Sequence, residues 1–212
     1  ALVLQSGSSA GRDSAKVQFQ TVLSKKATGV QAAVAHYGLS VVYALDGDAA
    51  QAYAEAQKAV QMAGRNDVFL QKNLLQTRYA MAADKKPVLK EIAALANDNP
   101  LSVMLAKTYI EDLYEQGMHE EILKYLKGQS AISQDNADYF RYLARSSEAL
   151  GRRSEAFRAT GKMYALQGDW KMAAYQFKQA QRVSDGDFFT MSEVDADLRE
   201  AEDHLKQDKP HH

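Results

Sequence analysis

Apolar residues recur along almost the whole chain at the spacing of an amphipathic α-helix. A clear example is the series Val30, Ala33, Val34, Tyr37, Val41 and Ala44. Sustained apolar–polar alternation bounded by turn residues, which is typical of β-strands, is not found. Glycine, aspartate and asparagine interrupt the helical pattern at intervals. The pattern therefore predicts an all-α protein of about ten or eleven helices.

The interruptions contain glycines at a regular spacing. Gly47 and Gly117 are 70 residues apart, Gly117 and Gly151 are 34 apart, and a missing member of the series falls near Asp84. A period of about 34 residues is typical of stacked helical hairpins. Glycine suits a tight turn between antiparallel helices because it adopts a left-handed backbone without steric cost.

A six-residue sequence repeats around two of these turns. Residues 43–48 read Tyr-Ala-Leu-Asp-Gly-Asp, and residues 164–169 read Tyr-Ala-Leu-Gln-Gly-Asp. Small and large apolar residues follow at matching steps, and small ones allow close helix packing. They are Ala52, Ala56 and Ala59 in one copy and Ala173, Phe177 and Ala180 in the other.

This pattern resembles the tetratricopeptide repeat, in which a small residue and an aromatic residue lie seven and four positions before the turn glycine. Ser40 with Tyr43 and Gly161 with Tyr164 fit this pattern, whereas the repeat around Gly117 is degenerate. Gly151 and Gly168 are 17 residues apart, so the helix between them closes one hairpin and opens the next. We therefore expect an all-α, tetratricopeptide-type helical-hairpin solenoid. The alternative is an irregular helical bundle with accidental glycine spacing.

The chain divides into three expected segments. Residues 1–13 are interpreted as a cloning remnant or a disordered lead, residues 14–206 as the repeat array, and residues 207–212 as a tail ending in a purification-tag remnant, His211-His212. At one helix start, Asn99 is expected to cap and Pro100 to occupy the first turn. At another, Thr190 and Glu193 are expected to form a capping box, after a turn at residues 184–187.

Composition argues against several classes of function. Lys and Arg number 26 and Asp and Glu 27, so a net charge of -1 provides no global attraction to nucleic acid. The apolar runs are much shorter than the roughly 20 residues that span a bilayer, and the absence of cysteine excludes disulfides and thiolate metal sites. The sequence therefore predicts neither nucleic-acid binding nor a membrane span.

Catalytic signatures are lacking as well. His119-Glu120-Glu121 begins like a zinc-peptidase motif, but Leu123 stands where the second histidine is required. His36 lies among apolar residues and is interpreted as a packed histidine. The glycines form no phosphate-binding fingerprint. We therefore predict that this chain is not an enzyme and has no catalytic, cofactor-binding or metal-binding residues.

Stacked hairpins form a concave wall from the outward residues of each first helix. Projection from the turn glycines places ten residues in this partner-binding groove: Tyr37, Val41, Lys107, Glu111, Tyr114, Arg141, Arg145, Glu148, Arg158 and Lys162. The early part is apolar, while Arg141 and Arg145 are expected to neighbour Arg158 and Lys162. Because arginine binds carboxylates bidentately, one hypothesis is that this basic patch receives acidic side chains. The alternative is an ordinary solvated charged surface.

Several segments carry a more specific resemblance. They are residues 143–158, the repeated sequence at 164–169, the Asp-Gly-Asp-Phe-Phe sequence at 185–189, the following helix with Leu198-Arg199-Glu200, and Ala35-His36-Tyr37-Gly38. Together they resemble the C-terminal repeat region of bacterial periplasmic HtpX-like zinc metalloproteases, the β-barrel assembly-enhancing proteases. The likeness covers about residues 14–206, although residues 67–134 match only by repeat pattern.

The resemblance implies that zinc and the His-Glu-x-x-His motif belong to a preceding protease domain that this chain lacks. It implies a periplasmic location and a noncatalytic role in protein–protein interaction. The partners would be outer-membrane β-barrel assembly components, substrates of the protease, and the protease domain itself. Two alternatives remain from the sequence: a free-standing repeat scaffold or co-chaperone that binds peptide tails, and an oligomerisation module.

Overall fold

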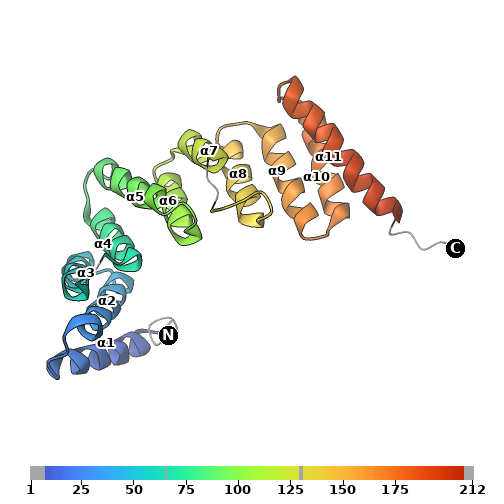
Figure 1. Cartoon of the computed structure of the whole chain (residues 1–212). Helices are drawn as coiled ribbons and strands as arrows, with labels where there is room; N and C mark the ends of the chain where they lie inside the picture. The colour runs from blue at the N-terminus through green and yellow to red at the C-terminus, as the bar shows by residue number, and fades with distance from the viewer. Residues whose placement is uncertain (1–7, 65, 129–130, 208–212) are drawn as a thin grey trace. The chain divides into compact units, whose positions relative to one another are not determined.

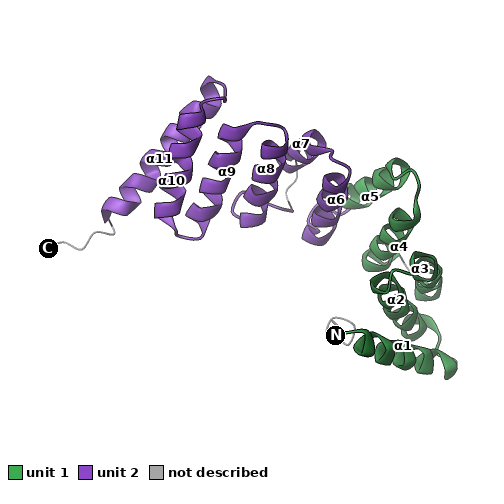
Figure 2. Ribbon diagram, turned by 180° about the vertical axis from the view of Figure 1, so that it is seen from behind, with its two compact units in different colours: residues 1–98 green, residues 99–212 purple. Residues whose placement is uncertain are grey.

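The computed structural model describes residues 8–64, 66–128 and 131–207 of the chain. Within these residues it contains eleven α-helices and no β-strand (Figure 1), which confirms the all-α prediction and the expected number of helices. The chain divides into two compact units, with the boundary between Asp98 and Asn99 (Figure 2). Each unit is therefore described separately.

Unit 1 consists of five helices, and each packs on the next along the chain. Helix α2 also contacts α4, so these two lie on the same side of α3. The helices are α1 (Ser9–Ser24), α2 (Gly29–Leu45), α3 (Ala49–Ala63), α4 (Val68–Met81) and α5 (Lys86–Asp98).

Unit 2 consists of six helices, and the last, α11, packs on both α10 and α9. One core cluster is built from residues of α6, α7, α8 and α9 and includes Ile110, Leu113 and Ile122. A second cluster around Phe177 joins α10 to α11. The helices are α6 (Val103–Glu115), α7 (His119–Gly128), α8 (Ala137–Ala149), α9 (Arg153–Leu166), α10 (Trp170–Val183) and α11 (Phe188–Gln207).

The four glycine turns expected from the sequence share one geometry. Gly47, Gly117, Gly151 and Gly168 all have positive φ, between 67° and 80°. In each turn the residue after the glycine donates its backbone N–H to the carbonyl five residues earlier, over 2.8–3.0 Å. A side chain at the glycine would be strained there. The turn glycines were therefore predicted correctly.

The turn near Asp84 achieves the same reversal without glycine. Lys85 Nζ donates to the carbonyl of Tyr79 over 2.7 Å, and the Asp84 carboxylate accepts the N–H of Lys86 over 3.1 Å. Side-chain hydrogen bonds thus close the turn between α4 and α5, where the sequence has no glycine.

Small residues bring neighbouring helices close together at two positions in the chain. A Cβ added to Gly161 in α9 would lie 2.4 Å from the ring of Phe177 in α10. A Cβ added to Gly38 in α2 would lie 2.3 Å from the ring of Phe19 in α1. In both pairs the glycine leaves the space that a phenylalanine ring fills.

The array begins earlier than the sequence indicated. Helix α1 starts at Ser9, inside the segment interpreted as a remnant or lead, and the Ser8 hydroxyl caps it by accepting the N–H of Gly11. Arg12 then pairs with Asp46 at the end of α2, over 2.6 Å. The proposed tag remnant His211-His212 lies outside the described residues.

Two expected helix starts are wrong. Helix α6 begins at Val103 and is capped by Ser102, whose N–H donates to the carbonyl of Asn99, so Pro100 lies in a turn before the helix. The predicted turn at residues 184–187 is confirmed, but α11 already begins at Phe188. Asp187 caps it by accepting the N–H of Thr190 over 2.7 Å.

Candidate functional site

An exposed apolar stripe runs along one face of α2. Val30 and Val34 are both 58% exposed, and Leu45 is 56% exposed. Tyr37 and Val41, two of the predicted groove residues, lie between them at helical spacing and are half-buried. Contiguous exposed apolar surface of this kind marks interaction sites in soluble proteins.

This stripe forms one wall of a groove whose other wall is α4, called here the α2–α4 groove. Two hollows of about 240 and 510 Å³ follow it, and both are lined by Tyr37. Phe69 and Leu70 form the apolar part of the α4 wall, and Phe69 is 63% exposed. The structure therefore brings the apolar part of the predicted groove together as one concave surface.

The chemistry of the groove changes along its length. Beyond Tyr37 the α4 wall presents Asn73, Gln76 and Thr77, and Asn73 Nδ2 donates to Ser40 Oγ over 2.9 Å. Exposed Lys25 and Lys26 precede α2 at the apolar end. Over its whole sequence, unit 1 has eleven Lys and Arg residues against eight Asp and Glu residues. The groove thus belongs to a unit with excess positive charge.

His36 lies within unit 1 in an ionic cluster. Its Nδ1 is 2.6 Å from Glu55 Oε2, and Lys58 Nζ is 2.7 Å from Glu55 Oε1. Burial acts to raise the pKa of Glu55, but the hydrogen bonds with Lys58 and His36 outweigh it and hold the pKa below its usual value. His36 is therefore a partly buried partner of a carboxylate, as its apolar sequence surroundings suggested.

In unit 2, the predicted groove residues of α6 pair with side chains of α8. Lys107 forms an ion pair with Asp138, Glu111 accepts a hydrogen bond from the Tyr142 hydroxyl over 3.1 Å, and Arg145 lies over the Tyr114 ring at 4.1 Å. The members of every pair are 31 residues apart. This constant separation shows that α6 and α8 face each other in register.

Arg141 lies in the first half of α8, and Glu148 lies near the end of this helix. The Arg141 guanidinium is 2.6 Å from Asp138, which also binds Lys107. The hydrogen bond with Lys107, together with the charge of Arg141, lowers the pKa of Asp138 despite partial burial. Glu148 is exposed and lines a small hollow between α8, α9 and α10.

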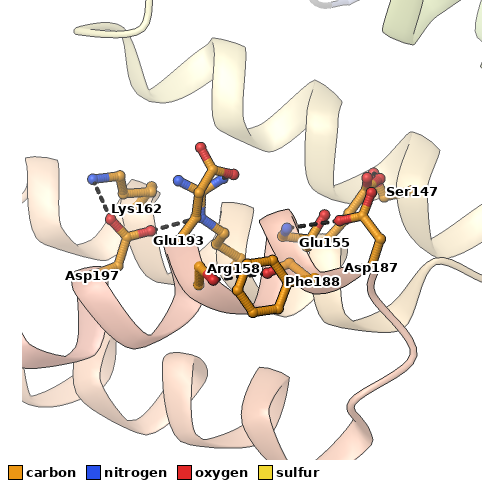
Figure 3. A network of polar contacts seen from close by, with 10 residues as sticks. Ser147, Glu155, Arg158, Lys162, Asp187, Phe188, Glu193 and Asp197 are labelled. Carbon is orange, nitrogen blue, oxygen red and sulfur yellow. Dashed lines mark hydrogen bonds and ion pairs between the residues drawn. The ribbon is translucent and has the colours of Figure 1, made fainter.

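Arg158 and Lys162 of α9 are bound by carboxylates of α11 (Figure 3). Arg158 Nε lies 2.7 Å and Lys162 Nζ 2.9 Å from the buried carboxylate of Asp197. Glu193 binds Arg158 over 2.5 Å, and Glu200 lies 4.0 Å from Lys162. These ion pairs connect α9 to α11, and they give both Arg158 and Lys162 carboxylate partners within the unit.

The predicted basic patch is therefore not assembled as one free surface. Arg141 and Arg145 engage Asp138 and Tyr114, whereas Arg158 and Lys162 engage α11. The sequence reasoning missed the acidic residues of α11. Their spacing, at 193, 197 and 200, places them on one helix face, and this acidic face was already visible in the sequence.

A second groove runs along α9 in unit 2 and is called here the α9 groove. Two hollows of about 410 and 210 Å³ form it, and both are lined by Gln134, Phe140 and Lys162. Helices α7, α8, α9 and α11 contribute residues to the larger hollow, and α8, α9, α10 and α11 contribute residues to the smaller one. Arg158 and Lys162 thus do line a concave surface, with their charges already paired.

In the part of the chain that the structure describes, no three His, Asp or Glu side chains converge as a metal site. Leu123, in the position of the missing zinc-motif histidine, is buried in the core. None of the described helices has the length and apolar character needed to cross a bilayer.

A scan against models of known protein families finds no match for this chain. A search of curated proteins finds no similar sequence.

Proposed function

We propose that this chain is a noncatalytic protein–protein interaction domain built from tetratricopeptide-type hairpins. The observation that carries the proposal is the α2–α4 groove, where Val30, Val34 and Phe69 expose more than half of their surface beside two hollows. Apolar side chains gain free energy when a partner removes them from water. A concave apolar surface with few polar groups is the usual form of a binding site.

The occupant that fits this groove is an apolar segment of another protein with acidic residues beside it. Helix α2 has 17 residues, so the stripe extends over roughly 25 Å at about 1.5 Å per residue. That length accommodates several turns of an amphipathic helix, whose apolar face packs into such grooves. Lys25, Lys26 and the excess positive charge of unit 1 favour acidic flanking residues.

The sequence resemblance to the β-barrel assembly-enhancing proteases extends this proposal to a biological setting. We propose that the chain is the recognition domain of a periplasmic zinc metalloprotease, in which a separate domain carries zinc and catalysis. The groove recruits components of the outer-membrane β-barrel assembly machinery or presents substrates to the protease. The sequence segments at 143–158, 164–169 and 185–189 support this setting.

The test compares two exposed valines. Val34→Asp places a charge in the α2–α4 groove, and Val17→Asp places the same charge on α1, where the valine is 62% exposed. In pull-downs from envelope extract, we expect Val34→Asp to reduce partner capture about tenfold or more, as loss of a central interface residue does. Val17→Asp should capture as the unmodified chain does, and circular dichroism should show both variants folded.

Equal capture by both folded variants would refute the α2–α4 groove as the binding site. The identity of the captured proteins tests the setting. Outer-membrane assembly components or unassembled β-barrels support a protease recognition domain, whereas recovery of only cytosolic proteins contradicts it and favours a free-standing scaffold.

A further inference from the structure

The α9 groove has an apolar interior and an exposed aromatic residue at its edge. Tyr139 and Phe140 line it, with their rings edge-to-face at 5.2 Å, and both are more than 90% buried. Phe189, at the start of α11, also lines it but is 70% exposed. An exposed aromatic residue beside a concave apolar surface is a typical anchor point for a partner side chain.

The charge around this groove is negative. Among the described residues, five carboxylates and three cations line its two hollows, which leaves a formal charge of -2. The cations are Lys127, Arg158 and Lys162, and the carboxylates are Glu155, Asp187, Glu193, Asp197 and Glu200. Unit 2 as a whole has fifteen Lys and Arg residues against nineteen Asp and Glu residues. The groove thus lies within a negative field.

The ion pairs that these groups already form determine which sign of charge a ligand of the groove should carry. Arg158 and Lys162 are already bound by α11, so an acidic ligand would compete with Asp197. Glu155 accepts only a long hydrogen bond, 3.3 Å from Ser147 Oγ, and makes no ion pair within the described residues. Asp187 already accepts hydrogen bonds at the start of α11, from Thr190 and from the backbone of Phe189. The Glu155 carboxylate is therefore available to a cationic ligand.

We infer that the α9 groove binds a cationic peptide segment that carries an aromatic side chain. The aromatic side chain packs between Phe189 and the buried rings of Tyr139 and Phe140, and a neighbouring Lys or Arg pairs with Glu155. This partner has the opposite charge to the one proposed for the α2–α4 groove. The sign is also opposite to that expected from Arg158 and Lys162 in the sequence alone.

The chain contains a natural probe for this groove. Trp170 is its only tryptophan and lines the smaller hollow, where it stacks on His204 with ring centroids 3.8 Å apart. The titration uses a short synthetic peptide of alternating Phe and Lys, and a matched peptide of alternating Phe and Glu, at constant pH. We expect the Phe–Lys peptide to change Trp170 fluorescence saturably and the Phe–Glu peptide to bind at least about tenfold more weakly.

Two adjacent phenylalanines provide matched variants. Phe189→Ala should weaken binding of the Phe–Lys peptide about tenfold, as loss of an aromatic anchor does. Phe188→Ala should leave it unchanged, because Phe188 is 89% exposed and lies outside the lining that the described residues define. Glu155→Gln should weaken the Phe–Lys peptide and leave the Phe–Glu peptide unaffected or slightly tighter.

Equal affinity for the two peptides, or equal effects of Phe188→Ala and Phe189→Ala, would overturn the inference. The result is independent of the α2–α4 groove, because Val34→Asp should not alter this titration. Failure of the peptide titration therefore does not bear on the function proposed for unit 1. Failure of the Val34→Asp pull-down likewise does not bear on the α9 groove.

Discussion

The ion pairs between α9 and α11 predict a large stability difference between two substitutions on the same helix. Asp197 is only 7% exposed, accepts a hydrogen bond from Arg158 over 2.7 Å and forms an ion pair with Lys162 over 2.9 Å. Asp197→Asn removes its charge but preserves its size. Glu200→Gln, one turn later, removes a charge that is 58% exposed and 4.0 Å from Lys162.

The burial of Asp197 determines how much free energy of unfolding the substitution removes. Removing one partner of a buried ion pair costs about 3–5 kcal/mol, because the other charge stays buried and unpaired. Here the cost is smaller, since the side chains of Arg158 and Lys162 are 25% and 29% exposed and Asn keeps one accepting oxygen. We expect Asp197→Asn to lower the free energy of unfolding by about 2 kcal/mol, or roughly thirtyfold in the equilibrium constant. Glu200→Gln should cost less than about 0.5 kcal/mol, as exposed pairs do.

Urea unfolding followed by Trp170 fluorescence measures this difference directly. Because Trp170 is the only tryptophan and lies in α10, its signal reports on unit 2. Urea carries no charge and so leaves the ion pairs unscreened. Equal midpoints for Asp197→Asn and Glu200→Gln would show that the α9–α11 ion pairs contribute no more than surface charges, and would refute the reasoning.

Two further predictions concern pH and packing. The pKa of Glu55 is lowered in the folded chain, so its ionisation stabilises unit 1 at neutral pH, and that contribution is lost as pH falls below about 4.5 toward the folded pKa. Thermal unfolding of Glu55→Gln should therefore vary less with pH in this range than that of the unmodified chain. Gly161→Ala gains about 1 kcal/mol of helix propensity, but overpacking against Phe177 typically costs 1–3 kcal/mol. We expect net destabilisation in calorimetry, whereas Gly128→Ala, with open space around it, should be neutral or stabilising.

Among the features of the fold, the glycine turns were predicted best from the sequence. Gly47, Gly117, Gly151 and Gly168 each need a positive φ, which is a local requirement that one residue type satisfies best. The turn near Asp84 contains no residue with positive φ and is closed by side-chain hydrogen bonds instead. Such bonds depend on long side chains at irregular positions, so they leave no periodic signal.

The first residues of the helices were harder to predict, because several neighbouring residues have side chains that can cap a helix N-terminus. Asn99 and Ser102 both have capping side chains, as do Asp187 and Thr190. In both cases the residue that caps is the one that the neighbouring turn places at the helix end. Local propensity alone does not rank such competitors, because the turn before the helix decides between them.

The groove residues show a similar limit. Projection from the turn glycines selected Tyr37 and Val41, and both residues line the larger hollow between α2 and α4. It also placed Arg158 and Lys162 in a groove, but their partners in α11 are 35–39 residues away in the chain. A repeat pattern describes equivalent positions within repeats and contains no information about charges on a helix that packs across them. The net sign of the surface therefore required the structure.

The two glycine–phenylalanine contacts restrict the order in which substitutions can accumulate during evolution. At Gly38 and Gly161 the space for a side chain is filled by the rings of Phe19 and Phe177. A lineage that first replaces the phenylalanine with a smaller residue opens room for a later alanine at the glycine. The reverse order passes through an overcrowded intermediate. Among homologous sequences, a side chain at either glycine position should therefore occur together with a smaller residue at its partner position.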